Sequence, residues 1–427
     1  LGVLCMKLAM TRLLSAATIL IFSSSIFAQS VTRGPYLQSV HEAGVVVRWR
    51  TDLATDSYVR FGTSAGALNQ TVSVGGTRTE HVVTLTGLSP LTKYYYSVGS
   101  NSGAIEGDAS YHFNTAPTPG PAAPTRLWVR GDSGTANTHP GLPESVRNAF
   151  VAYSAASPAD LMVMLGDNAY PDGTDSQYQD AVFDTYPVQL RQLPLWLTLG
   201  NHDGHSADSS TQTGPYYDMF TLPTAGEFGG LASGTEAYYS FDHGNIHFIS
   251  LNSYDVDRSV NGNMMQWLEG DLAFNDKPWV IAVWHHPPYT KGSHNSDTSN
   301  EETDMRQNAL PILEAWGVDL VLGGHSHSYE RSYLIDGHYG VSTTLDPVSM
   351  VLNPGDGRET GDGVYEKPDI AGAEHEGAVY VVAGSSGKVS NAAVDHPAMY
   401  VGLIELGSMV IDVSGNRLDA VFIDDNG

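Results

Sequence analysis

Five short apolar segments of this sequence are each followed by side chains that could bind metal ions or exchange protons. The sequences that follow these segments are Gly131-Asp132-Ser133-Gly134, Gly166-Asp167-Asn168-Ala169-Tyr170, Gly200-Asn201-His202-Asp203, His285-His286-Pro287-Pro288 and Gly323-Gly324-His325-Ser326-His327. Carboxylate, amide, phenol and imidazole donors without sulfur suit iron, zinc or manganese. The donors are too many for one tetrahedral site, and they suit two ions that share a carboxylate. Two ions about 3.5 to 4 Å apart can hold both oxygens of an in-line displacement at phosphorus.

The elements that must position these side chains are short apolar strands that alternate with helices. We predict strands at 127–130, 161–165, 195–199, 246–251, 279–284 and 319–322, and helices at 145–154, 264–274 and 305–316. Apolar strands alternating with helices indicate a layered α/β domain. In such domains ligands bind beyond the carboxyl ends of the strands, so the five loops are expected to converge. The tail, 379–423, is predicted to return to strands and turns.

The region before this domain reads as an all-β sandwich over residues 31–115. Candidate strands at 45–49, 57–61, 81–85, 93–98 and 110–113 are separated by turn sequences, as in small β-sandwiches. The segment 87–96 resembles the late-strand region of fibronectin type III domains, and Trp49 is expected in its core. Four prolines within 116–125 predict a stiff linker, which leaves 126–427 as the catalytic domain.

Composition excludes several functions. The 427 residues carry 47 acidic and 21 basic side chains, a formal net charge of -26. A protein that binds nucleic acid through phosphate neutralisation needs a basic face, so we expect no nucleic-acid partner. The single cysteine, Cys5, lies near the start of the chain. Disulfides, zinc ribbons and cysteine nucleophiles are therefore not expected in the mature protein.

Residues 1–28 are predicted to contain a secretory signal peptide. Lys7 and Arg12 precede the mostly apolar run 13–22, and Ala28 offers a small residue for cleavage. The alternative is a membrane anchor, for which the apolar run is short. We expect a periplasmic or secreted protein with no membrane segment after cleavage.

Residues 126–332 resemble the metallophosphoesterase superfamily and, more narrowly, the purple acid phosphatases. The family pattern of GDxG, GDxxY, GNH(E/D), an apolar strand before HxP, and GHxH occurs in order, and 324–332 closely matches GHxHxYERS. The sandwich, its beginning at 34–38 and the proline linker also resemble the domain that precedes the catalytic domain in larger members. The resemblance implies a four-layer α/β catalytic domain.

The resemblance also implies a role for each candidate residue. One ion, Fe(III), is expected to bind Asp132, Tyr170 and His327, and Asp167 is expected to bridge both ions. The second ion, Fe(II), Zn(II) or Mn(II), is expected to bind Asn201, His285 and His325. His286 stays open as an alternative ligand, although its position relative to Pro287 favours His285. His202 is expected to contact phosphate and protonate the leaving group, and His294 is expected as a second histidine of the pocket.

The predicted function is an exported phosphatase of the acid phosphatase type. A metal-bound hydroxide would attack a small phosphate monoester in line. The alternatives are a phosphodiesterase or nucleotide hydrolase with the same metal centre, or a non-catalytic surface protein.

Three structural expectations lie outside the ligand set. Glu330 and Arg331 are expected to form an ion pair beneath the metal-binding loop. Residues 301–304 are expected to form a solvated, acidic helix start. The segment 341–376, rich in Gly, Asp and Pro, is expected to form long loops near the site.

Overall fold

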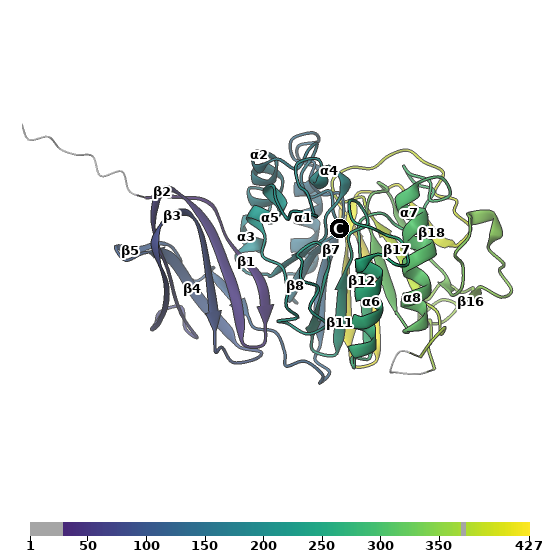
Figure 1. Cartoon of the computed structure of the whole chain (residues 1–427), viewed down its shortest axis with the longest axis horizontal. Coiled ribbons are helices and arrows are strands. Elements are labelled where there is room, and N and C mark those ends of the chain that lie inside the picture. Colours follow the sequence, from purple (N-terminus) through teal and green to yellow (C-terminus); the bar gives the residue numbers. More distant parts are fainter. Residues whose placement is uncertain (1–28, 369–372) are drawn as a thin grey trace, which may run out of the picture.

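The computed structural model describes residues 29–368 and 373–427, and the expected signal peptide lies outside them. A β-sandwich is followed by a layered α/β domain, which confirms the predicted fold class (Figure 1). Within the described ranges, no helix combines the length and the apolar character needed to cross a lipid bilayer.

The sandwich has six strands around one apolar core. They are β1 (Val31–His41), β2 (Gly44–Gly62), β3 (Gln70–Thr86), β4 (Lys93–Ser100), β5 (Gly103–Glu106) and β6 (His112–Asn114). The predicted strands 45–49 and 57–61 are parts of one long strand, because β2 continues through an irregularity between Arg50 and Ser57. Its first part pairs with β1 and its last part pairs with β4, so β2 joins these two strands. Trp49 is buried in this core, as predicted.

The first sheet of the α/β domain has five strands in the order β20-β19-β7-β8-β9. Three parallel strands carry the first three candidate loops at their carboxyl ends: β7 (Thr125–Arg130), β8 (Leu161–Met164) and β9 (Leu195–Leu197). The tail supplies β19 (Gly407–Ser414) and β20 (Arg417–Asp424), and β19 pairs antiparallel with β7.

The second sheet has seven strands in the order β10-β11-β12-β13-β17-β14-β18. They are β10 (Tyr239–His243), β11 (Ile246–Ser250), β12 (Trp279–Val283), β13 (Leu320–Gly323), β17 (Val379–Ala383), β14 (Tyr329–Ser332) and β18 (Met399–Leu403). Strands β11, β12, β13 and β17 are parallel. The last two candidate loops follow β12 and β13. A separate two-stranded sheet contains β15 (Leu334–Ile335) and β16 (Val351–Asn353).

Alternation along β12 shows how the layers stack. Ile281 and Val283 belong to the core that includes the first sheet, whereas Val280 and Ala282 pack in a second core with helices α6 (Asn263–Phe274) and α8 (Leu310–Ala315). Because successive strand residues face opposite sides, the second sheet lies between the first sheet and these helices (Figure 1). Helix α1 (Leu142–Tyr153) covers the first sheet, with Phe150 stacked on Trp128 of β7.

The other helices are short and lie near the candidate loops or between strands. They are α2 (Asp175–Tyr178), α3 (Pro187–Leu190), α4 (Asn201–Gly204), α5 (Pro215–Met219) and α7 (Asn300–Asp304), with π-helical turns at Gln179–Phe183 and Met305–Ala309.

The predicted helix at 305–316 begins earlier than expected. Turns α7, Met305–Ala309 and α8 follow one another without interruption from Asn300. The earlier start turns Glu302 inward, where its side chain is 0% exposed and burial raises its pKa to about 8. The expectation that residues 301–304 are wholly solvated is therefore wrong for Glu302.

Residues at the start of β1 attach the sandwich to the α/β domain. The Tyr36 hydroxyl donates to the Met219 carbonyl at 2.7 Å, and its ring lies 4.8 Å from that of Phe183. Arg33 pairs with Asp175 at 2.8 Å. These contacts combine apolar burial with directed polar bonds, so they fix the position of the sandwich beside α2 and α5.

The segment 341–376 was expected near the site, and its described residues lie only partly there. Ser342 donates to Asp297 in the loop after β12, but Lys367 contacts Asp319 at the start of β13, the end opposite the candidate loops. The described part of the segment therefore has contacts at both ends of the second sheet. Its composition indicated loops but contained no signal for the direction they take.

His247 on β11 is a buried histidine of the second sheet, and its ionisation provides a test of the fold. Its Nδ1 lies 2.8 Å from Asp242 and its Nε2 lies 2.9 Å from Asp271. Burial alone would lower the pKa of this imidazole, but the two carboxylates outweigh it and raise the pKa from 6.5 to about 9. A raised folded-state pKa stabilises the protein fully below the unfolded pKa, and this stabilisation disappears as the pH rises through the folded pKa.

We therefore expect the unfolding free energy of the wild type, relative to His247→Gln, to fall by about 3 kcal/mol between roughly pH 6.5 and 9.5. Urea denaturation across this range measures it. His205→Gln, which changes a half-exposed histidine, is the control and should follow the wild type. Parallel curves for wild type and His247→Gln would contradict the prediction.

Candidate metal centre

Three of the predicted ligands follow glycines at strand ends and have left-handed backbone geometry. The φ angles are 56° at Asp132, 51° at Asp167 and 63° at His325. Non-glycine residues seldom adopt this geometry, and where they do the residues often belong to functional sites. The conformation turns the chain sharply after β7, β8 and β13.

The Tyr170 hydroxyl is the centre of one group of donors. It lies 3.0 Å from Asp132 Oδ1, 2.8 Å from Asp167 Oδ2 and 3.2 Å from His327 Nε2. All four side chains are buried. Three separate strands therefore bring two carboxylates, a phenol and an imidazole to one point.

His285 is the centre of a second group. Its Nε2 lies 3.1 Å from Asn201 Oδ1 and 3.3 Å from Asp167 Oδ1. Its Nδ1 donates to the Leu165 carbonyl at 2.8 Å, which fixes the ring with Nε2 turned toward the other donors. The His325 ring completes this group at 5.0 Å from the His285 ring.

Asp167 lies between the two groups. Its Oδ2 faces Tyr170, and its Oδ1 faces His285 and also accepts the His202 N–H at 2.9 Å. One carboxylate with its two oxygens turned to different donor groups has the arrangement needed to bridge two ions. The seven predicted ligands thus lie together at one place in the structure.

The chemistry of these donors fits metal ions. Ligand atoms of Asp132, Asp167 and His285 lie within 4.8 Å of one another, as do those of His285, His286 and His325. Buried carboxylates this close together are costly unless a cation compensates their charge. Oxygen and imidazole donors suit iron, zinc or manganese.

The geometry favours His285 over His286 as a ligand. His286 Nδ1 lies 2.9 Å from Ser253 Oγ, and its ring lies 4.3 Å from that of His325. Only His285 contacts both Asp167 and Asn201. His286 instead packs against the His325 ring, a role that the sequence did not indicate.

The ionisation of the metal-free site follows from burial and from Asp167. Burial would lower the pKa of His285, but the Asp167 charge outweighs it and raises the pKa to about 9. The same charge pair outweighs burial at Asp167 and lowers its pKa. Burial, and then the neighbouring imidazoles, hold the pKa of His325 well below its usual value. Burial and the two carboxylates raise the pKa of Tyr170.

The two predicted catalytic histidines lie at the edges of this cluster. His202 Nδ1 lies 2.6 Å from the Pro171 carbonyl, while its Nε2 lies 3.9 Å from Asp167 Oδ2. The His294 ring stacks on His325 with centroids 3.7 Å apart. Both imidazoles therefore adjoin the proposed ligands from outside the two donor groups.

Three residues near the ligands were not predicted as members of the site. Asp203 is buried and accepts from Gly200 N, from the Asn168 amide and from Tyr178 OH, which fixes the loops after β8 and β9. An acidic residue three positions after Gly200 is a helix-capping signal that could have indicated this role. Ser390 and Lys388 had no such signal, because they come from the loop after β17. Ser390 Oγ lies 3.0 Å from His327 Nδ1, and Lys388 Nζ lies 5.4 Å from the Tyr170 ring centre.

The expected pair of Glu330 and Arg331 does not form. Adjacent residues of β14 face opposite sides, so the two side chains separate. Arg331 donates to the Asp356 carbonyl at 2.9 Å, whereas Glu330 is buried against Thr290.

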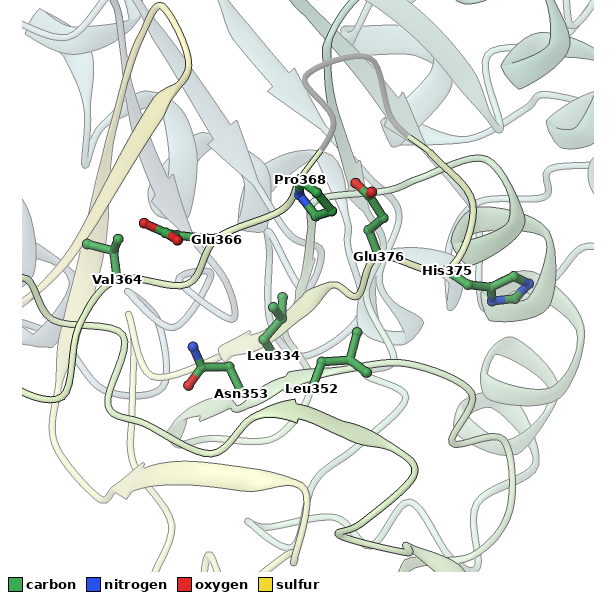
Figure 2. A pocket seen from close by; sticks show the side chains of 8 residues that line it. All are labelled: Leu334, Leu352, Asn353, Val364, Glu366, Pro368, His375 and Glu376. Carbon is green, nitrogen blue, oxygen red and sulfur yellow. The ribbon is translucent and has the colours of Figure 1, made fainter.

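The α/β domain also has a pocket of about 480 Å³, and Figure 2 shows the side chains that line it. It is lined by Leu334, Leu352, Asn353, Val364, Glu366, Pro368, His375 and Glu376. None of the predicted ligands or catalytic histidines lines it, so the metal centre is not part of this pocket.

Comparisons with known proteins match both domains. Residues 125–329 match the calcineurin-like phosphoesterase family, and residues 34–115 match the purple acid phosphatase N-terminal domain. Purple acid phosphatase 23 of Arabidopsis thaliana is 31% identical over 350 residues, covering 75% of this chain and 69% of that protein. Purple acid phosphatase 15 of the same plant is 30% identical over 309 residues, covering 65% of this chain. The match spans only 54% of the length of purple acid phosphatase 15.

A solved structure shows the same fold. A purple acid phosphatase isolated from yellow lupin (Lupinus luteus) seeds has a TM-score of 0.68 and 19% sequence identity. The match covers 92% of this chain and 72% of the lupin chain. The similarity thus extends across both the sandwich and the α/β domain.

The raised pKa of His285 predicts proton release when metal binds. At about pH 7 the metal-free imidazole is protonated, and a metal must displace this proton. We expect zinc to release roughly one proton or more per chain, and its affinity to fall as the pH falls. Calorimetric titration in two buffers of different ionisation enthalpy measures this.

His285→Ala should reduce the release. His247→Gln should leave it unchanged, because His247 has a similarly raised pKa but lies in the core of the second sheet. Zinc binding without proton release at about pH 7 would contradict the prediction.

Proposed function

This chain belongs to the purple acid phosphatase family of calcineurin-like phosphoesterases, and on that premise we propose that it is an exported phosphatase that hydrolyses small phosphate monoesters with two metal ions. The observation that carries the proposal is the position of Asp167. Its two oxygens face two donor groups, at 2.8 Å from Tyr170 and 3.3 Å from His285.

The residues divide into two ligand sets around this carboxylate. Asp132, Tyr170 and His327 would hold Fe(III), because hard phenol and carboxylate oxygens suit this ion. Asn201, His285 and His325 would hold Fe(II), Zn(II) or Mn(II). When bound, the ions supply an activated water in mild acid and take up negative charge on the phosphoryl oxygens.

His202 would supply the proton for the leaving group. Its Nδ1–H donates to the Pro171 carbonyl at 2.6 Å, which fixes the ring and leaves Nε2 facing the centre. A proton held at Nε2 can pass to the ester oxygen as the bond to phosphorus breaks. The His202 side chain is about one-third exposed, so it can recover this proton from solvent.

His294 would bind the phosphoryl group from the other side of His325. Its ring is partly buried and stacks on His325, a proposed metal ligand. It can therefore hold a phosphoryl oxygen in a fixed direction. The two histidines thereby orient the ester between them.

Export is proposed from the sequence of residues 1–28 and from the lack of cysteine after Cys5. A chain without thiols after residue 5 avoids oxidation and mispairing of cysteines in a periplasm or outside a cell. The compartment can be tested by fractionating cells that express the full chain.

Hydrolysis of two esters of the same alcohol tests the function. The metal-loaded protein should release p-nitrophenol from the monoester with at least about tenfold higher kcat/KM than from the diester, because each phosphoryl contact of a monoester dianion is stronger. Asp132→Asn should lower the monoester rate by about a thousandfold or more, since it removes a charged ligand. Asp172→Asn changes an exposed carboxylate and should retain activity.

Preference for the diester would replace the proposal by a phosphodiesterase or nucleotide hydrolase. Bound metal with no release from either ester, or from a panel of nucleotides, would instead indicate a non-catalytic protein.

Tyr170 provides a spectroscopic test of the first ligand set. In this family a tyrosine oxygen bound to ferric iron absorbs visible light, so the oxidised iron-loaded protein should be coloured. Tyr170→Phe should lose the band and keep the fold, while Tyr153→Phe, a half-exposed tyrosine on α1, should keep both. Visible spectra with metal analysis measure this. A colourless, iron-free but active enzyme would contradict the assignment.

A further inference from the structure

The buried carboxylate of Glu330 joins two loops of the candidate site. Glu330 Oε1 lies 2.5 Å from Thr290 Oγ1 and 2.9 Å from Ser328 Oγ, and Oε2 accepts the Lys291 N–H at 3.3 Å. Thr290 and Lys291 belong to the loop after β12, whereas Ser328 follows the His325 and His327 turn. One side chain of β14 therefore holds both segments.

A short chain of hydrogen bonds continues from Glu330 to His294. Thr290 Oγ1 accepts the Gly292 N–H at 3.0 Å and lies 2.8 Å from Ser326 Oγ. Ser326 Oγ in turn accepts the His294 N–H at 3.4 Å. These partners are buried or half-buried, so the contacts are little weakened by water.

Gly292 shows how closely the loop approaches this network. A Cβ at this position would lie 2.2 Å from Ser326 Oγ and 2.3 Å from Ser328 Oγ. No larger residue fits there without moving the hydroxyls. The backbone of Gly292 thus lies in close contact with the hydroxyl groups that are hydrogen-bonded, directly or through Thr290, to Glu330.

The loop that carries His294 has no helix or strand between Val283 and Asn300 to fix it. Its position depends on side-chain contacts of the kind just described. We propose that Glu330 is a positioning residue that holds the loop 290–294 so that the His294 imidazole stays stacked on His325. This inference rests on the proposed function, in which His294 orients the phosphoryl group.

Hydrogen exchange tests the anchoring without any catalysis. Glu330→Ala should speed amide exchange of peptides covering 290–294 by about tenfold or more, in metal-free and zinc-loaded protein alike. Glu330→Gln should restore part of the protection, because its amide oxygen can still accept from Thr290. Thr290→Val, close in shape to the native residue, should resemble Glu330→Ala and serves if that variant fails to fold.

Glu314→Gln is the matched control. Glu314 on α8 is also a buried glutamate, with hydrogen bonds from Tyr339 OH, Tyr380 OH and Gly337 N, and none of these partners belongs to residues 290–294. Its substitution should leave exchange at 290–294 unchanged. Unchanged exchange in Glu330→Ala and Thr290→Val would overturn the anchoring.

A double-mutant cycle tests the connection to His294. On the monoester, Glu330→Ala should lower kcat/KM by about ten- to a hundredfold with zinc content unchanged, as expected when a reacting group is misplaced. In a His294→Ala background the same substitution should cost less than about twofold, because the group it positions is already absent.

The outcomes separate the two proposals. Independent effects in the cycle, or loss of zinc in Glu330→Ala, would overturn the positioning role, because Glu330 would then act on the ligand turn itself. Faster exchange at 290–294 in a protein that cleaves no ester would support the anchoring and contradict the proposed function.

Discussion

The site depends on one carboxylate that must serve two groups of donors at once. Asp167 can do this because glycines of neighbouring loops let the backbone approach the carboxylates closely. A Cβ on Gly200 would lie 2.3 Å from Asp167 Oδ1, and a Cβ on Gly324 would lie 2.5 Å from Asp132 Oδ2. The glycines of the motifs are therefore needed for close approach of neighbouring loops as much as for turning the chain. Any side chain at these two positions would separate the strand ends that the donors require.

Burial makes this arrangement both useful and unstable without a cation. Asp132 and Asp167 are almost wholly buried, with Tyr170 and three imidazoles beside them. In the metal-free protein a proton on His285 and the Tyr170 hydroxyl hydrogen supply the compensation, at positions between the donors. A metal ion would replace these hydrogens and bind the same atoms more strongly. Folding stability and metal affinity are consequently linked through the same few atoms.

The local parts of this architecture could be predicted from the sequence, because glycine followed by a polar donor after an apolar strand is a short-range pattern. This pattern, read together with the family motifs, indicated the seven candidate ligands that the fold brings together, and the positions of β7, β8, β12 and β13 to within a few residues. Contacts between distant segments had no such signal. Ser390 supports His327 from 63 residues away, and Glu302 turns inward only because its helix begins at Asn300. Glu330 and Arg331 look like an ion pair in the sequence, but strand alternation sends them to opposite faces.

The place of the tail in the sheets has a consequence for biosynthesis. Strand β7 opens the α/β domain, yet one of its two neighbours is β19, nearly 300 residues later, and β17 from the same tail borders β13. Sheet edges that will become interior stay open while the chain is being made, and open edges invite pairing with other chains. The strand before His325, β13, gains its last neighbour only when β17 has been made, and the strand before Asp132, β7, gains its last neighbour only when β19 has been made. A nascent chain of this protein thus has open strand edges until β17 and β19 have been made, and a chaperone that shields strand edges would act during that interval.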